Sequence, residues 1–113
     1  MFKNFIRRWE GKLKKYADRY AHRPDIEKDK NFQSLYKKVG STKSKYTLTG
    51  VDRCYSLYKA IKYITKGDIQ GDIVECGVWR GGSAMLAALT LIENQQTHRK
   101  IYLYDTYEGM SEP

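Results

Sequence analysis

Residues that combine charge, small size and hydrogen-bonding groups are concentrated in "DIVECGVWRGGSAM", residues 72–85. Glu75 lies in an apolar run, Gly77 and Gly81 follow it, and Ser83 precedes an alanine-rich run. An acidic residue that closes a strand, followed by glycines that open a helix, brings backbone N–H groups and a helix N-terminus to a polar or anionic ligand. The pattern therefore predicts a ligand-binding turn.

Two common classes of phosphate ligand match this turn poorly. A P-loop requires GxxxxGK[ST], and "GVWRGGS" supplies Gly77, Gly82 and Ser83 but no lysine between the last two. A dinucleotide site requires GxGxxG, and here Trp79 stands where the second glycine lets a pyrophosphate approach the backbone. The sequence therefore disfavours nucleoside triphosphates, NAD and FAD.

A ligand without a pyrophosphate agrees better with the residues present. Glu75 offers a carboxylate to a cation or an amine, and Ser83 can bind a carboxylate at the start of a helix. Gly77 and Gly81 allow close approach to the backbone, and Asp105, at the end of the next apolar run, is placed to accept both hydroxyls of a ribose. A ligand built from an amino acid and a nucleoside fits this set, and S-adenosylmethionine is the common one.

The elements that would position these residues follow from the apolar pattern. Two short apolar runs, Ile73–Cys76 and Ile101–Tyr104, flank a helix predicted over residues 83–93. The order strand, turn, helix, strand favours a parallel pair joined by a right-handed crossover. A longer helix precedes them, for which Thr49 is the predicted N-cap and Gly67 the predicted end.

The N-terminal part differs in charge and composition. Residues 1–50 hold 14 basic and 5 acidic side chains, a net +9, so the basicity of the whole chain (+8) belongs to them. Residues 2–20 predict a basic amphipathic helix, which either packs on the core of the protein or binds an anionic membrane or nucleic acid. Residues 22–44 predict a polar linker with one short helix. We therefore divide the chain into residues 1–45 and 46–113.

Length and cysteine usage limit the class of protein. A chain of 113 residues builds at most one small domain. Cys54 and Cys76 lie far apart without metal-ligand spacing, so both are predicted to be buried free thiols and no metal site is assigned. No apolar window is long enough for a membrane span, and the expected location is the cytoplasm.

Three blocks of the sequence, "YTLTGVDRCYSLYKAIKYI", "GDIVECGVWRGGSAMLAALTL" and "RKIYLYDTYEGM", resemble in order and spacing the macrocin O-methyltransferase (TylF/MycF-like) family of class I S-adenosylmethionine-dependent methyltransferases. The resemblance covers about residues 32–113. It implies an α/β, Rossmann-like class I methyltransferase fold, truncated here after the second strand and preceded by an N-terminal helical extension. It also implies an O-methyltransferase that acts on a sugar or other hydroxyl of a small molecule.

The resemblance assigns roles to nine residues and leaves the chemistry of the acceptor unassigned. The loop around the methionine part of the cofactor would comprise Glu75, Gly77, Val78, Trp79, Gly81 and Ser83, Asp105 would hold the ribose, and Thr106 and Tyr107 would border the adenine. Thr49 would lie close to the cofactor, although its predicted role as an N-cap explains it equally well. Mg²⁺ is expected for the full-length family, but its ligands and the catalytic residues belong to later strands and are not assigned in this chain.

We therefore expect this chain to be the cofactor-binding N-terminal fragment of such an enzyme and to be inactive by itself. Its partner would be a small-molecule hydroxyl substrate, a homo-oligomer is compatible with the resemblance, and no nucleic acid is expected. The competing hypothesis makes residues 2–20 a non-catalytic basic module that binds an anionic membrane surface or nucleic acid.

Overall fold

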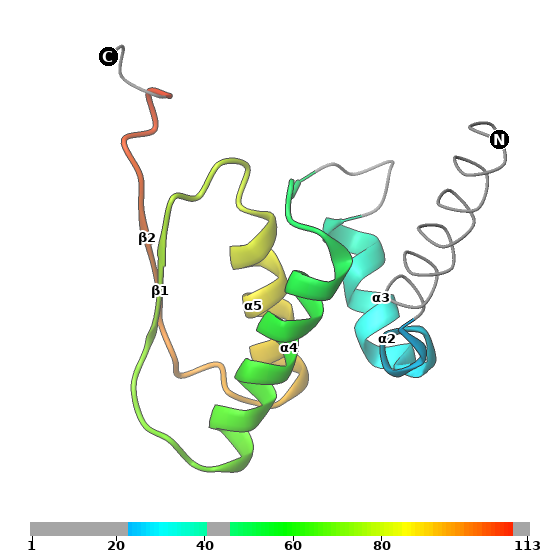
Figure 1. Cartoon of the computed structure of the whole chain (residues 1–113). Helices are drawn as coiled ribbons and strands as arrows, with labels where there is room; N and C mark the ends of the chain where they lie inside the picture. Colours follow the sequence, from blue (N-terminus) through cyan, green and yellow to red (C-terminus); the bar gives the residue numbers. More distant parts are fainter. Residues whose placement is uncertain (1–22, 41–45, 110–113) are drawn as a thin grey trace, which may run out of the picture.

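A computed structural model describes residues 23–40 and 46–109. The basic helix predicted over residues 2–20 lies outside these ranges. The elements in chain order are α2 (Pro24–Lys28), α3 (Lys30–Val39), α4 (Val51–Lys66), β1 (Ile73–Cys76), α5 (Gly82–Glu93) and β2 (Ile101–Tyr104). They lie in three layers, with the strands on one side of α4 and α5 and the pair α2 and α3 on the other (Figure 1).

The two strands pair in parallel, as the order of elements predicted. Ile73 lies opposite Ile101 and Cys76 opposite Tyr104, so both predicted strands have the bounds expected from their apolar runs. One face of this sheet, carrying Ile73 and Ile101, packs on a small apolar cluster. That cluster consists of Ile61 from α4 and Ala87 and Leu91 from α5. The strand pair is thereby fixed to the helix that follows β1.

The opposite face of the sheet is exposed. Val74 and Tyr104 keep 59% and 60% of their accessible surface, and Cys76 is exposed beside them. The prediction of two buried thiols is therefore right for Cys54, which is 1% exposed, and wrong for Cys76. The reason is the alternation of side chains along a strand, which directs Val74 and Cys76 away from the helices. Parallel sheets are normally covered on both faces. Within the described residues this strand pair is covered on one face only.

The ends of α4 and α5 lie at or within one residue of the positions predicted from the sequence. Gly67 ends α4 and α5 begins at Gly82, one residue before the predicted start. The N-cap of α4 is Gly50, and the predicted cap Thr49 makes no capping bond. Instead the backbone N–H of Thr49 donates to Thr47 Oγ1 at 3.0 Å, which holds residues 46–49 in a turn of their own.

Residues 24–39 form two helices and contribute to the core, which corrects the prediction of a polar linker with one short helix. Phe32 is fully buried, and its ring centroid lies 4.9 Å from that of Tyr55 and 5.4 Å from that of Tyr58 on α4. Asp29 caps α3, because its Oδ1 accepts a hydrogen bond from Phe32 N at 3.0 Å. The division of the chain at residue 45 stays a prediction about domain organisation.

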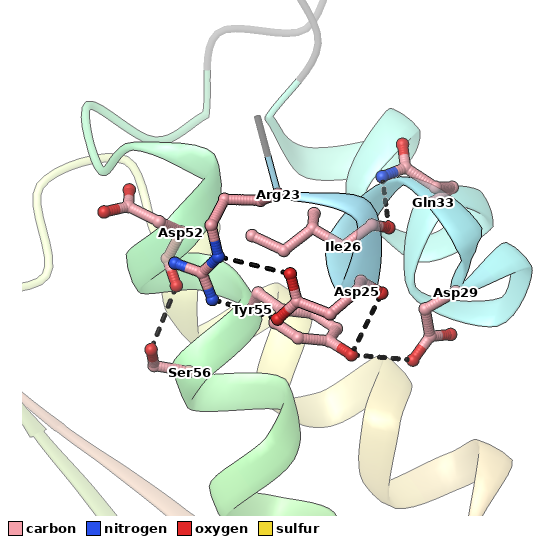
Figure 2. A network of polar contacts seen from close by, with 8 residues as sticks. All are labelled: Arg23, Asp25, Ile26, Asp29, Gln33, Asp52, Tyr55 and Ser56. Atoms are coloured by element: carbon pink, nitrogen blue, oxygen red, sulfur yellow. Dashed lines mark hydrogen bonds and ion pairs between the residues drawn. The ribbon is translucent and has the colours of Figure 1, made fainter. Parts of the chain in front are cut away.

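Polar contacts join α2, α3 and α4 at the edge of this core (Figure 2). The hydroxyl of Tyr55 lies 3.4 Å from both Asp25 O and Asp29 Oδ2, and Gln33 Nε2 donates to Ile26 O at 2.9 Å. Burial and the neighbouring carboxylates raise the pKa of Tyr55 above its ordinary value, so the hydroxyl stays protonated and acts as a donor. These contacts fix α2 to α4, and we assign them a structural role.

The loop before β1 is fixed by one buried arginine. Arg99 is 8% exposed, and its guanidinium donates to Gly71 O and Ile69 O, both at 2.6 Å, and to Gln96 Oε1 at 3.0 Å. A planar guanidinium can satisfy several carbonyls at once. Arg99 thereby sets where β1 begins relative to β2. Within the described residues, no helix is long and apolar enough to cross a membrane.

Candidate functional site

The loop that joins β1 to α5, residues 77–81, turns sharply because three of its residues have a left-handed backbone. Gly77 and Gly81 have φ angles of +85° and +78°, and Trp79 has a φ angle of +49°. Glycine adopts this region without a steric penalty, whereas a bulky side chain there is strained. Strain of this kind is found mostly at functional sites. The loop therefore has the backbone expected of a binding turn.

The carboxylate of Asp105 holds this loop to the end of β2. Its Oδ2 accepts hydrogen bonds from Val78 N at 2.6 Å and from Trp79 N at 3.4 Å, and its Oδ1 accepts one from Tyr107 N at 3.1 Å. The backbone N–H groups of Tyr107 and Val78 lower the pKa of Asp105 below its ordinary value, because they stabilise the charged form. Asp105 is thus an anion that ties two turns together.

These bonds limit how Asp105 can bind a ribose. An ionised carboxylate offers about four acceptor positions, and three backbone N–H groups occupy positions on Asp105. The backbone N–H of Thr106 also stabilises this carboxylate, so its acceptor positions are nearly filled. A ribose hydroxyl would have to replace one of these bonds, and the 3.4 Å bond from Trp79 N is the longest of those with a measured length. Sequence reasoning placed Asp105 beside the turn, and the structure adds that its first role is to hold the loop.

Glu75 has one carboxylate oxygen, Oε2, that is buried and has no hydrogen-bond partner among the described residues. Burial raises the pKa of Glu75 above its ordinary value, and a hydrogen bond from the backbone N–H of Ala84 opposes this in part. A buried polar atom without a partner is costly and calls for an explanation. A cationic or hydrogen-bond-donating ligand group would supply the missing partner.

A pocket of about 130 Å³ opens beside the loop. Ligand pockets commonly measure about 300–1,000 Å³, so this one accommodates one end of a small ligand. The structure brings five of the nine predicted site residues to its wall. They are Glu75, Gly77, Val78, Trp79 and Ser83, and residues 46–49 also line the pocket.

The other four predicted residues lie outside this wall. Gly81 is the N-cap of α5. Asp105 does not line the pocket, but its carboxylate accepts hydrogen bonds from the backbone of Val78 and Trp79, which do. Thr106 closes the next turn by donating from Oγ1 to Gly109 O at 3.0 Å. Tyr107 is 67% exposed, and its hydroxyl donates to Leu103 O at 3.3 Å. The proposed contact of Thr106 and Tyr107 with an adenine stays a prediction.

A larger pocket of about 270 Å³ lies between the sheet and the helices and shares Glu75 and Ser83 with the smaller one. Its lining is mostly apolar, with side chains such as Leu57, Ile73 and Ala87. Specific ligand sites carry a few convergent polar groups in addition to an apolar wall. We therefore place the candidate site in the smaller pocket, where the loop, the start of α5 and residues 46–49 meet.

Sequence reasoning missed part of this wall. Thr49 was expected near the ligand and does line the pocket, but Tyr46, Thr47 and Leu48 were not singled out. Gly82 was also passed over, although its backbone N–H donates to Tyr46 O at 2.9 Å. The only sequence signal for this contact is the second glycine of the "GG" pair, since a glycine also marks a close approach of two backbone segments.

Trp79 stands at the rim of the pocket with 52% of its surface exposed. The guanidinium of Arg80 lies over its ring, 4.8 Å from the centroid. An arginine over an aromatic face is held by the ring quadrupole. Arg80, which was left out of the predicted site, therefore acts on the position of the Trp79 ring.

Metal binding has no support in the described residues. Residues 23–40 and 46–109 contain no group of three or more His, Cys, Asp or Glu side chains that could hold a metal ion. The Mg²⁺ expected for the full-length family therefore does not fit any donor set described here, and no step is assigned to a metal.

Comparison with known families gives a match over nearly the whole chain. The family model described as Macrocin-O-methyltransferase (TylF) matches residues 6–113. The motif blocks alone indicated a resemblance from about residue 32, so the match begins earlier than the sequence analysis placed it. It includes most of the basic segment over residues 2–20.

Three curated relatives carry O-methyltransferase names. The chain is 34% identical over 67 residues to 8-demethyl-8-(2,3-dimethoxy-alpha-L-rhamnosyl)-tetracenomycin-C 4'-O-methyltransferase of Streptomyces olivaceus, over 59% of this chain and 26% of that protein. It is 28% identical to demethyldecarbamoylnovobiocin O-methyltransferase of Streptomyces niveus, over 58% of this chain and 25% of that protein. It is also 28% identical to mycinamicin III 3''-O-methyltransferase of Micromonospora griseorubida, over 57% of this chain and 25% of that protein. The chain thus spans about a quarter of the length of each relative, and no solved structure matches it.

Proposed function

The chain belongs to the macrocin O-methyltransferase (TylF) family, and from this we propose that its described part binds the methyl donor S-adenosylmethionine for an O-methyltransferase reaction. The observation that carries the proposal is Glu75 Oε2, a buried acceptor without a hydrogen-bond partner among the described residues, on a residue that lines a pocket at the start of α5. The ammonium group of the donor is the cation that would complete it. We propose that residues 46–113 belong to a Rossmann-like class I methyltransferase domain.

The amino-acid end of the donor fits the smaller pocket. The N–H groups of Gly82 and Ala84 are engaged by Tyr46 O and Glu75, and Ser83 lies between them on the pocket wall. We assign the donor carboxylate to Ser83, because the positive end of the α5 dipole favours an anion there. The ammonium and carboxylate groups of the donor are attached to the same carbon, so Glu75 and Ser83 would bind them side by side at one end of the ligand.

The ribose is assigned to Asp105. This carboxylate is ionised and already accepts bonds from backbone N–H groups. Binding of a ribose hydroxyl would exchange the 3.4 Å bond from Trp79 N for a bond to the ligand. We therefore expect ribose binding and the position of Trp79 to be coupled.

The bound donor supplies an electrophilic methyl group on sulfur. The chain's own contribution is to orient that donor, with Glu75 and Ser83 fixing one end and Asp105 the other. Binding energy then offsets the loss of translational and rotational entropy before the reaction step. The acceptor we propose is a hydroxyl of a small natural product, as in the names of the three relatives. A group that removes the hydroxyl proton is not assigned among the described residues, and this unit alone is expected to bind the donor without turnover.

Calorimetric titration with S-adenosylhomocysteine tests the proposal. We expect saturable binding to the chain and much weaker binding of 5'-methylthioadenosine, which lacks the ammonium and carboxylate groups. An analogue without the ribose hydroxyls should lose affinity as well, and deleting a ligand group leaves the bonds of Asp105 to the loop intact. Equal affinity for S-adenosylhomocysteine and 5'-methylthioadenosine would remove Glu75 and Ser83 from the site.

The competing basic-module hypothesis receives less support. The family match runs through most of residues 2–20, so these residues are accounted for within the enzyme family. Binding of the chain to anionic vesicles that disappears on deletion of residues 2–20, together with no binding of S-adenosylhomocysteine, would reverse this preference.

A further inference from the structure

The wall of the candidate site is built from two segments that are distant in the chain. Residues 46–49 and the start of α5 both line the pocket. One backbone hydrogen bond joins them, from Gly82 N to Tyr46 O at 2.9 Å. The position of the first segment relative to the pocket therefore depends on how closely it approaches Gly82.

The approach at Gly82 leaves no room for a side chain. A Cβ atom built at this position would lie 2.5 Å from the Cβ of Thr47 and 2.6 Å from the backbone carbon of Tyr46, and closer still to Tyr46 O. Two of these atoms belong to the backbone, so a rotamer change cannot relieve the clash. Gly82 is buried and lies in α5 without a left-handed backbone, so the need for glycine here is steric.

Helix propensity alone predicts the opposite effect of a side chain here. Alanine is favoured over glycine in helices by about 1 kcal/mol, so replacing Gly82 by alanine would stabilise α5 if nothing packed against it. The contact with residues 46–49 reverses this expectation, because the segment must move away from α5 to admit a methyl group. The sign of the effect thus distinguishes the two explanations.

We infer that Gly82 is a positioning residue of the donor site: the absence of its side chain seats residues 46–49 against α5 and so forms one wall of the pocket that holds the amino-acid end of the ligand. This inference rests on the proposed function as far as the ligand is concerned. The seating of the segment itself is a property of the chain and is tested separately.

The test uses Gly82→Ala in the full chain, with Gly67→Ala as the matched control. Gly67 also lies at a helix end and has an ordinary backbone, but a Cβ there would lie 3.3 Å from its nearest neighbour, Tyr63 O, and far from the pocket. Gly82→Ala should weaken binding of S-adenosylhomocysteine by about tenfold or more, since displaced binding groups lose affinity steeply. Gly67→Ala should leave the affinity unchanged. Equal affinity of Gly82→Ala and the parent, in a folded protein, would overturn the inference.

A second readout reports on the wall without any ligand. In a Trp9→Phe background Trp79 is the remaining tryptophan, and it lines the same pocket as residues 46–49. Gly82→Ala should increase quenching of its fluorescence by acrylamide, and Gly67→Ala should not. If the parent fails to bind S-adenosylhomocysteine while this quenching difference appears, the proposed function fails and the positioning role stands. An unchanged quenching constant in folded Gly82→Ala would refute the seating.

Hydrogen exchange of the unmodified chain covers the case in which Gly82→Ala does not fold. The amide of Gly82 should exchange slowly, because it is buried and bonded to Tyr46 O. The amides of a helix's first turn otherwise lack intrahelical partners, so fast exchange at Gly82 would contradict the inference directly.

Discussion

Replacing Glu75 by glutamine is expected to stabilise the fold near neutral pH and to weaken binding of the methyl donor. The structure leaves Glu75 Oε2 buried without a partner, and burial raises the pKa of this carboxyl group. A carboxyl whose pKa is raised on folding contributes fully to stability below its unfolded pKa, about 4.3, and loses that contribution as the pH rises through the folded value. Above that range the charged form opposes folding, and glutamine removes the charge.

The magnitude follows from the degree of burial. An unsatisfied buried polar group costs about 1–3 kcal/mol, and more when it is charged. Glutamine keeps a polar group at this place and removes only the excess cost of the charge, and Glu75 is partly buried and already receives a hydrogen bond from Ala84 N. The lower end applies, so the gain for Glu75→Gln near pH 7 should be about 1 kcal/mol. For a unit of this size that corresponds to a rise of about 4–8 °C in Tm. Near pH 4 the gain should vanish, because both side chains are then neutral.

Binding should change in the opposite direction. A hydrogen bond between charged partners contributes about 1.5–3 kcal/mol, so Glu75→Gln should weaken S-adenosylhomocysteine roughly 10- to 150-fold. The matched control is Glu93→Gln, which removes the same charge from an exposed position at the far end of α5. Denaturant unfolding between pH 4 and 8 and calorimetric titration measure the two effects. A loss of stability at pH 7, or unchanged affinity in Glu75→Gln, would refute the reasoning.

Four further substitutions or conditions test other parts of the structure. Arg99→Lys keeps the charge but loses the fork that serves two carbonyls, and chemical denaturation should show a loss of about 2–3 kcal/mol. Phe32→Ala should cost about 3–5 kcal/mol in the same measurement if α3 is part of one core; a change near zero would separate residues 24–39 from that core. Trp79→Gly should be more stable than Trp79→Ala by about 1 kcal/mol, because the backbone there is left-handed. The pKa of Asp105 is depressed below its ordinary value of about 3.9, and lowering the pH through it should release the loop. In the Trp9→Phe background this release should appear as increased quenching of Trp79 fluorescence. Asp105→Ala should show high quenching at every pH.

Local signals in the sequence were sufficient for the elements that carry the site. The two strands, the end of α4 at Gly67 and the helix after the glycine turn lie where apolar runs and glycines placed them. Such features depend on a few adjacent residues, which is why a single sequence reveals them. The parallel pairing followed because the helix between the strands is long enough for a crossover connection.

Features decided by distant contacts were not predictable in this way. Phe32, Leu35 and Val39 recur at helical spacing, which agrees with the short helix predicted in this stretch. The packing of Phe32 on Tyr55 and Tyr58 of α4 is a long-range contact that this local pattern does not specify. The contact of Gly82 with Tyr46 O is equally long-range, and no local pattern distinguishes such a glycine from an ordinary turn residue. The exposure of Cys76 is different, because it follows from a local signal. Side chains alternate along a strand, so Cys76 must face away from the side that Glu75 occupies.

The proposed donor site is bounded by two backbone contacts between described residues. Asp105 holds the start of the loop through Val78 N, and Gly82 N at the start of α5 holds residues 46–49 through Tyr46 O. Both ends of the turn are therefore fixed before any ligand binds, so ordering them adds little to the cost of binding. Donor binding can consequently be measured on this chain independently of methyl transfer. Binding without turnover is the combination that the structure predicts, whereas turnover by this chain would require an acid–base group that the assignments above do not include.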